Sequence, residues 1–234
     1  MQRVPFIELD LYPPFEGFPK EGITFLRQLK RNNNRPWFNK HKEEYEASVK
    51  LPMQSLISAL KPRLAQIAPE IEADPKRSMF RIYRDTRFSK DKSPYKTHVA
   101  AIFHPRGHWQ ESAGLYLEIE PANVGLAGGI YMPQSSLLKL LRRAIADRPE
   151  EFMGVVKNRK FKKLFGGLEG DKLKRTPQGF PPDHPMSEWL KFKQLYVYLE
   201  WPVAKCHRAA FVDDVAKVFD QMLPLVRFLN EAIE

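Results

Sequence analysis

Cysteine is almost absent from this chain of 234 residues, in which Cys206 is the only one. A single cysteine excludes an internal disulfide bond and fits a reducing compartment. No run of 18 consecutive apolar residues occurs, so the sequence predicts no membrane-spanning helix. The N-terminal segment also lacks the apolar core and small-residue cleavage site of a secretory signal. We therefore expect a cytoplasmic protein that does not enter a membrane.

The glycine-rich motifs of nucleotide-binding folds are missing as well. The segment GLAGG (125–129) does not match G-x-G-x-x-G, and no P-loop sequence occurs. The chain contains no internal repeat and no low-complexity tract. Apolar residues make up 43% of the chain and aromatic residues 12%, which is enough to build a packed core. We expect one globular domain that spans residues 1–234.

The hydrophobic patterns indicate a mixture of helices and short strands. The segments with helical spacing of apolar residues are 18–31, 36–67 with interruptions at Pro52 and Pro62, two helices in series within 135–156, 188–191 and 208–233. The segments in which apolar and polar residues alternate are 79–84, 98–104, 113–120, 122–131 and 195–200. The predicted fold class is α+β, with long N-terminal and C-terminal helices. Its mostly antiparallel sheet of about five strands is covered by helices on one face.

The other face of this predicted sheet is polar, aromatic and charged in both signs. Its side chains are Arg81, Tyr83, His98, His104, Tyr116, Glu118, Glu120, Tyr196, Tyr198 and Glu200. Two interpretations stay open, a solvated sheet surface with internal ion pairs and a polar cleft roofed by other elements. The glutamates argue against a platform that stacks nucleic-acid bases, because each carboxylate repels phosphate.

Positive charge is concentrated in two segments of this basic protein. Residues 76–96 hold eight lysines and arginines against Asp85 and Asp91, a net charge of +6 in a chain of net charge +10. Residues 157–175 also carry a net charge of +6, so the rest of the chain is slightly negative. Two local patches favour the binding of discrete anions over the coating of a long polyanion.

Four segments carry a resemblance to a known family. They are NNNRPWFNKHKEEY (32–45), FRIYRDTRFSKDKSPYKT (80–97), GGIYMP (128–133) and LKRTPQGFPPDHP (173–185). They resemble the successive motifs of an uncharacterised family, domain of unknown function 2461, and the second segment is the most specific. The resemblance implies one complete domain and supplies no activity.

Two catalytic or metal-binding arrangements are disfavoured by their context. Ser89 and Ser93 each precede a lysine in the S-x-x-K spacing of serine acyl-enzymes, but Pro94 predicts a loop where that chemistry needs a helical turn. His98, His104 and His108 would bind a metal with Glu118 only if the turn after Pro105 folds back, and exposed histidines are more often surface residues. We expect no metal site and no cofactor, and we expect Cys206 to pack as a small apolar residue.

The basic segment 81–96 is the candidate site. Arginines that alternate with aromatic residues offer planar donors for phosphate or carboxylate. The predicted ligand-binding residues are Arg81, Tyr83, Arg84, Arg87, Lys92, Tyr95 and Lys96. Asp85 and Glu118 are the candidates for a catalytic role, although surrounding cations would keep Asp85 ionised and weakly basic. The competing interpretation is a solvated loop whose arginines already pair with the chain's own carboxylates.

Three functions follow from these features, and the first is favoured. The protein binds, or acts on, a small anionic ligand through segment 81–96. Alternatively, it binds nucleic acid through segments 76–96 and 157–175, or it docks an acidic protein partner. The sequence predicts neither the reaction nor the oligomeric state.

Overall fold

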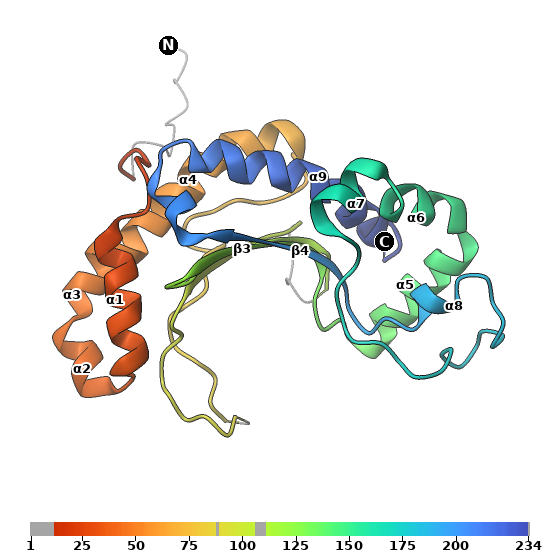
Figure 1. The fold of residues 1–234 in the computed structure, drawn as a ribbon, viewed down its shortest axis with the longest axis horizontal. Helices are drawn as coiled ribbons and strands as arrows, with labels where there is room; N and C mark the ends of the chain where they lie inside the picture. Colours follow the sequence, from red (N-terminus) through yellow and green to blue (C-terminus); the bar gives the residue numbers. More distant parts are fainter. Residues whose placement is uncertain (1–11, 88, 106–110, 234) are drawn as a thin grey trace, which may run out of the picture. The chain divides into compact units, whose positions relative to one another are not determined.

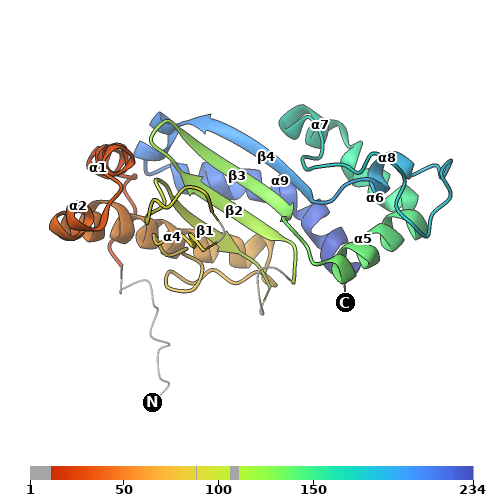
Figure 2. The same ribbon diagram turned by 90° about the horizontal axis from the view of Figure 1, so that it is seen from below.

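The computed structural model describes residues 12–87, 89–105 and 111–233 of the chain, and its fold is α+β. One antiparallel sheet contains four strands, β1 (Val99–Phe103), β2 (Gly114–Ile119), β3 (Asn123–Ile130) and β4 (Leu195–Pro202). Their order across the sheet is β1-β2-β3-β4 (Figure 2). The predicted fold class is therefore confirmed, with four strands in place of about five.

The segment predicted as the first strand, residues 79–84, is not a strand of this sheet. Only isolated bridges involve it, from Met79 to Ala101 and from Tyr83 to Tyr95. The segment follows β1 briefly, through the amide of Phe80 to the carbonyl of Ala100 at 2.9 Å, and then leaves it. Its alternating side chains belong instead to one side of a hairpin, and Tyr95 lies on the opposite side. Alternation reveals extended backbone and does not identify the partner strand.

The helices occupy the segments in which helical spacing is seen, except α7, which lies in the basic segment 157–175 where no helix is predicted (Figure 1). They are α1 (Lys20–Arg31), α2 (Arg35–Lys40), α3 (Lys42–Tyr45), α4 (Leu51–Ile67), α5 (Ser135–Asp147), α6 (Pro149–Val156), α7 (Arg159–Phe165), α8 (Ser187–Leu190) and α9 (Phe211–Glu231), with a π-helical turn η2 (Glu46–Lys50) and a 3₁₀ turn η3 (Val203–His207). None of these described helices combines the length and the hydropathy needed to cross a membrane.

The long helical segment after α1 is interrupted near Pro52, as predicted, whereas the interruption predicted at Pro62 is wrong. At η2 the amide of Leu51 donates to the carbonyl of Glu46, five residues back, and Pro52 follows in the first turn of α4. Proline has no amide hydrogen, so Pro52 cannot donate the α-helical bond to the carbonyl of Ser48. Gly22 of α1 lies directly against this carbonyl, because a Cβ at Gly22 would meet the Ser48 oxygen at 2.2 Å. Pro62, by contrast, lies inside α4 without ending it.

The chain separates into two compact units, each built from several segments. The first comprises the described parts of Met1–Ile102, Leu117–Gly125 and Trp201–Ala216, and the second comprises those of Phe103–Tyr116, Leu126–Glu200 and Lys217–Glu234. All four strands and helix α9 contribute residues to both units. The prediction of a single domain stays a prediction.

Aromatic side chains form the part of the first unit's core that supports the candidate site. Phe25 of α1 is fully buried and contacts Phe38 of α2 and Tyr45 of α3, with ring centroids 6.3 and 5.8 Å apart. Phe38 in turn stacks on Tyr95 at 4.1 Å. This chain of buried rings attaches the basic hairpin to the helices, because burying each ring removes a large apolar area from water.

In the second unit, α9 packs on the strands through its apolar face. Phe219 lies edge-on to Phe103 of β1 at a centroid distance of 5.7 Å, and Phe228 contacts Phe152 of α6 at 5.3 Å. Gly128 of β3 permits close approach, since a Cβ there would meet the side chain of Met222 at 2.6 Å. The amphipathic pattern predicted for residues 208–233 therefore corresponds to a helix that lies on the sheet.

Candidate functional site

The described residues of the basic segment 80–97 form a hairpin, here termed the hairpin arm. The amide of Arg84 donates to the carbonyl of Pro94 at 2.9 Å, and the amide of Lys96 donates to the carbonyl of Ile82 at 2.8 Å. Asn33, in the link between α1 and α2, holds the arm by two further bonds. Its amide nitrogen donates to the carbonyl of Tyr95 at 2.9 Å, and its carbonyl oxygen accepts from the Tyr95 amide at 3.0 Å. The arm is thus tied to the helices by hydrogen bonds from the Asn33 side chain as well as by stacked rings.

Several cations of the arm already have partners within it. Arg87 forms an ion pair with Asp85 at 2.7 Å, and its exposed guanidinium also donates through Nε. Arg84 forms a close ion pair with Asp91 across the turn. The ammonium of Lys92 donates to the carbonyl of Thr86 at 2.9 Å. The interpretation of internal pairing therefore holds for part of the segment.

These pairs keep the two aspartates ionised. Hydrogen bonds from Arg87 lower the pKa of Asp85 to about 2, and hydrogen bonds from Ser93 and Arg84 lower the pKa of Asp91. A carboxylate with so low a pKa is a poor proton acceptor at neutral pH. The geometry therefore supports a pairing role for Asp85 and gives no support to a role as general base.

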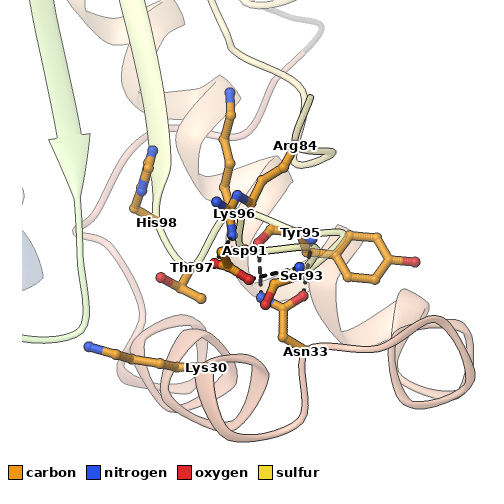
Figure 3. Close-up of a pocket in the computed structure, with 9 residues that line it drawn as sticks. All are labelled: Lys30, Asn33, Arg84, Asp91, Ser93, Tyr95, Lys96, Thr97 and His98. Carbon is orange, nitrogen blue, oxygen red and sulfur yellow. Dashed lines mark hydrogen bonds and ion pairs between the residues drawn. The ribbon is translucent and has the colours of Figure 1, made fainter. Parts of the chain in front are cut away.

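A pocket of about 390 Å³ opens between the hairpin arm and the end of α1 (Figure 3). Its lining residues are Lys30, Asn33, Arg84, Asp91, Ser93, Tyr95, Lys96, Thr97 and His98. Three of them are lysines or an arginine, and one is an aspartate. Burial is the main cause that lowers the pKa of Lys96, whose ammonium lies 4.7 Å from the centroid of the Phe80 ring. The pocket is therefore polar and carries an excess of positive charge.

The structure brings together some of the predicted site residues and separates others. Arg84, Tyr95 and Lys96 line the pocket, whereas Arg81, Tyr83, Arg87 and Lys92 are not among its lining residues. The ring of Tyr95 is buried and points away from the charged groups, so this residue contributes to the wall mainly as support (Figure 3). Tyr83 is half exposed and contacts Tyr95 at 5.5 Å.

Sequence reasoning missed the contribution of α1 to the pocket. Lys30 lies 50 residues and Asn33 lies 47 residues before Phe80, the first residue of the hairpin, so no local pattern connects them to it. The side-chain amide of Asn33 is the sequence feature that could have indicated this contact, because an asparagine at the end of a helix can form hydrogen bonds to the backbone of another segment. Thr97 and His98 were missed as pocket residues because their position depends on where the arm rejoins β1.

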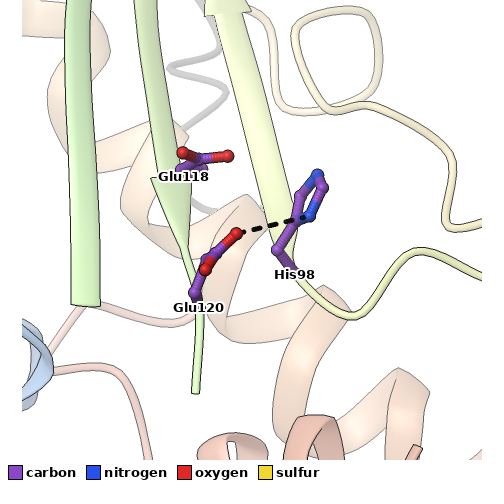
Figure 4. Close-up of side chains that lie close together, drawn as sticks. All are labelled: His98, Glu118 and Glu120. Carbon is purple, nitrogen blue, oxygen red and sulfur yellow. Dashed lines mark ion pairs between the residues drawn. The ribbon is translucent and has the colours of Figure 1, made fainter. Parts of the chain in front are cut away.

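A second cluster adjoins the pocket at His98. Glu118 of β2 and Glu120 just after it lie beside His98, which directly precedes β1 (Figure 4). One ligand atom from each of the three side chains lies within 4.8 Å of the others, and His98 Nδ1 is 3.9 Å from Glu120 Oε1. Burial is the largest effect on the pKa of His98 and lowers it, while both carboxylates act in the opposite direction.

The histidine arrangement considered from the sequence differs from this cluster. His104 lies in the second unit, where its Nδ1 is 2.7 Å from the carbonyl of Pro105. His108 lies outside the described residues. Glu118 lies beside His98, as that hypothesis required. Glu120, which the hypothesis did not include, is the third residue of the cluster.

The other basic segment, 157–175, belongs to the second unit. Residues 159–165 form α7, with the exposed cations Lys160, Lys162 and Lys163 on its surface. Cys206 is fully buried, and burial raises the pKa of its thiol to about 12, which fits its predicted role as a packed apolar residue.

Comparison with known proteins gives one match. No curated protein and no solved structure matches the chain. The model of a family described as "Conserved hypothetical protein (DUF2461)" matches residues 21–228, which include the hairpin arm, the pocket and the cluster at His98. The chain therefore belongs to the DUF2461 family of conserved hypothetical proteins, as its four motif segments predict.

Proposed function

We propose that the protein binds a small anion, bearing phosphate or carboxylate, in the pocket between the hairpin arm and α1. The observation that carries this proposal is the charge of the pocket lining. Lys30, Arg84 and Lys96 line a space of about 390 Å³ in which Asp91 is the one acidic lining residue. A pocket of this size accommodates a small metabolite.

Arg84 is the central anion-binding group of this proposal. Its side chain is only 28% exposed and its position is defined by the ion pair with Asp91. A guanidinium has five N–H donors in a planar fork, so pairing with one carboxylate still allows it to bind an anion. Asp91 orients Arg84 and also offsets one positive charge, which favours ligands with one or two negative charges over long polyanions.

Lys96 and the neutral side chains complete the proposed site. Because the Lys96 ammonium is half-buried, an anion beside it interacts in a medium less polar than bulk water and therefore more strongly. Asn33, Ser93 and Thr97 add hydrogen-bonding groups to the wall. No activated nucleophile is identified in this lining, so the proposal is one of binding and names no reaction.

Isothermal titration with inorganic phosphate and a panel of phosphorylated and carboxylated metabolites tests the proposal, with EDTA present to exclude metal ions. We expect Arg84→Ala and Lys96→Met each to weaken binding of the best anion at least tenfold, about 1.4 kcal/mol. The matched control is Arg77→Ala. It removes an exposed arginine that belongs to the basic segment 76–96 but does not line the pocket. The proposal fails if no anion binds, or if the three variants lose affinity equally.

A further inference from the structure

We propose that His98, Glu118 and Glu120 form a binding site for one divalent first-row transition-metal ion, such as Mn²⁺, Fe²⁺ or Zn²⁺. The site goes beyond anion binding by the pocket, and neither proposal depends on the other. It is assembled within the first unit by neighbouring strands of one sheet.

The backbone places the three side chains on the same face. Glu118 of β2 and Glu120 just after its end are two residues apart, so they project in the same direction, and β1 beside β2 brings in His98 (Figure 4). A metal bound at about 2.0–2.2 Å places its ligand atoms about 3–3.5 Å from one another. The present separations, up to 4.8 Å, need only side-chain rotations to reach this spacing. Rigid strands hold the Cα positions while the side chains adjust.

The chemistry of the cluster suits such an ion. A metal binds the neutral form of imidazole, and the ring nitrogen Nδ1 of His98 lies 3.9 Å from Oε1 of Glu120. The two glutamates together supply the charge that neutralises a divalent cation. Because one ligand is nitrogen and two are oxygen, the set favours Mn²⁺, Fe²⁺ or Zn²⁺ over Ca²⁺ and Mg²⁺, which prefer oxygen alone, and over ions that select thiolates.

The position of His98 gives an independent reason to expect a ligand here. The same residue lines the cationic pocket, so the cluster borders a space that solvent and small molecules can enter. Three protein ligands leave coordination positions open, which is the pattern of metal sites that also bind a substrate or water.

Electron paramagnetic resonance of Mn²⁺ tests the inference on the full chain after treatment with EDTA and removal of the chelator. The spectrum measures free Mn²⁺, and no anionic ligand is added. We expect one bound ion per chain. His98→Ala, Glu118→Gln and Glu120→Gln are each expected to weaken binding at least tenfold, and Zn²⁺ is expected to compete. Glu43→Gln, an exposed glutamate of α3, is the matched control and should leave the affinity unchanged.

Two results would overturn the inference, namely no stoichiometric Mn²⁺ or Zn²⁺ binding by the wild type, or equal binding by all of these variants. The two glutamine substitutions preserve side-chain shape, and thermal melting identifies any variant that fails to fold. Since the anion titration is carried out in EDTA and the metal titration without anion, failure of one proposal is distinguishable from failure of the other.

Discussion

Individual side chains in the hairpin arm show why counting charges overstates the available positive charge. Arg87 pairs with Asp85 two residues away, and Arg84 pairs with Asp91 across the turn. The first pair is readable from proximity in the sequence, whereas the second depends on how the arm folds back. What distinguishes Arg84 from Arg87 is location, because Arg84 lines the pocket and Arg87 is 78% exposed. Screening by water makes an exposed pair contribute little to stability.

Among single residues, His98 is expected to titrate below its ordinary pKa of 6.5, because burial opposes its charged form. The unfolded state then takes up a proton first as pH falls, so this residue makes the folded state less stable below about pH 6.5 than above it. Glu118→Gln and Glu120→Gln should lower the pKa of His98 further, since each removes a negative charge.

Histidine ring shifts followed by nuclear magnetic resonance during a pH titration of the metal-free protein measure this pKa. Glu43→Gln should leave the titration of His98 unchanged. A pKa of His98 at or above 6.5, or one that rises when Glu120 is replaced, would contradict the burial argument.

Among the helices, the contact of α1 with the π-helical turn η2 is the most sensitive to side-chain size. Gly22→Ala should destabilise the protein by about 1–3 kcal/mol, the usual cost of overpacking. Its added methyl group would lie 2.2 Å from the carbonyl oxygen of Ser48, which is backbone and cannot rotate away. Chemical denaturation measures the change.

The matched control for this substitution is Gly154→Ala in α6. Apart from its chain neighbours and the backbone of its own helix, no atom lies within 4 Å of a Cβ at Gly154, so alanine is expected to be neutral or to stabilise by about 0.5–1 kcal/mol through its higher helix propensity. If both alanine variants had the same stability, the close approach of α1 to η2 would not be a determinant of stability.

For the whole molecule, the distribution of charge between the two units separates the favoured function from its alternatives. The pocket lies in the first unit, whereas the cations of α7 lie in the second. We therefore expect the triple variant Lys160→Glu, Lys162→Glu and Lys163→Glu to bind small anions as the wild type does. Any affinity for duplex DNA should fall steeply between 50 and 200 mM salt and be reduced by this variant.

Fluorescence anisotropy with a labelled duplex and calorimetry with the anion measure the two affinities on the same preparations. Loss of small-anion binding in the triple variant would favour a shared polyanion surface. A partner protein captured by the wild type and lost by the triple variant would favour docking of an acidic protein instead.

The sequence by itself determined the fold class, most of the helices, the four strands of the sheet and the family, because these depend on local periodicity and on contiguous motifs. Even the break near Pro52 follows from a missing amide hydrogen. Only the tertiary structure decided that residues 82–84 pair with the opposite side of the hairpin, that Lys30 and Asn33 line the pocket, and that Glu120 lies beside His98. These arrangements join residues distant in the sequence, and their register is set by packing and hydrogen bonds that no local pattern specifies.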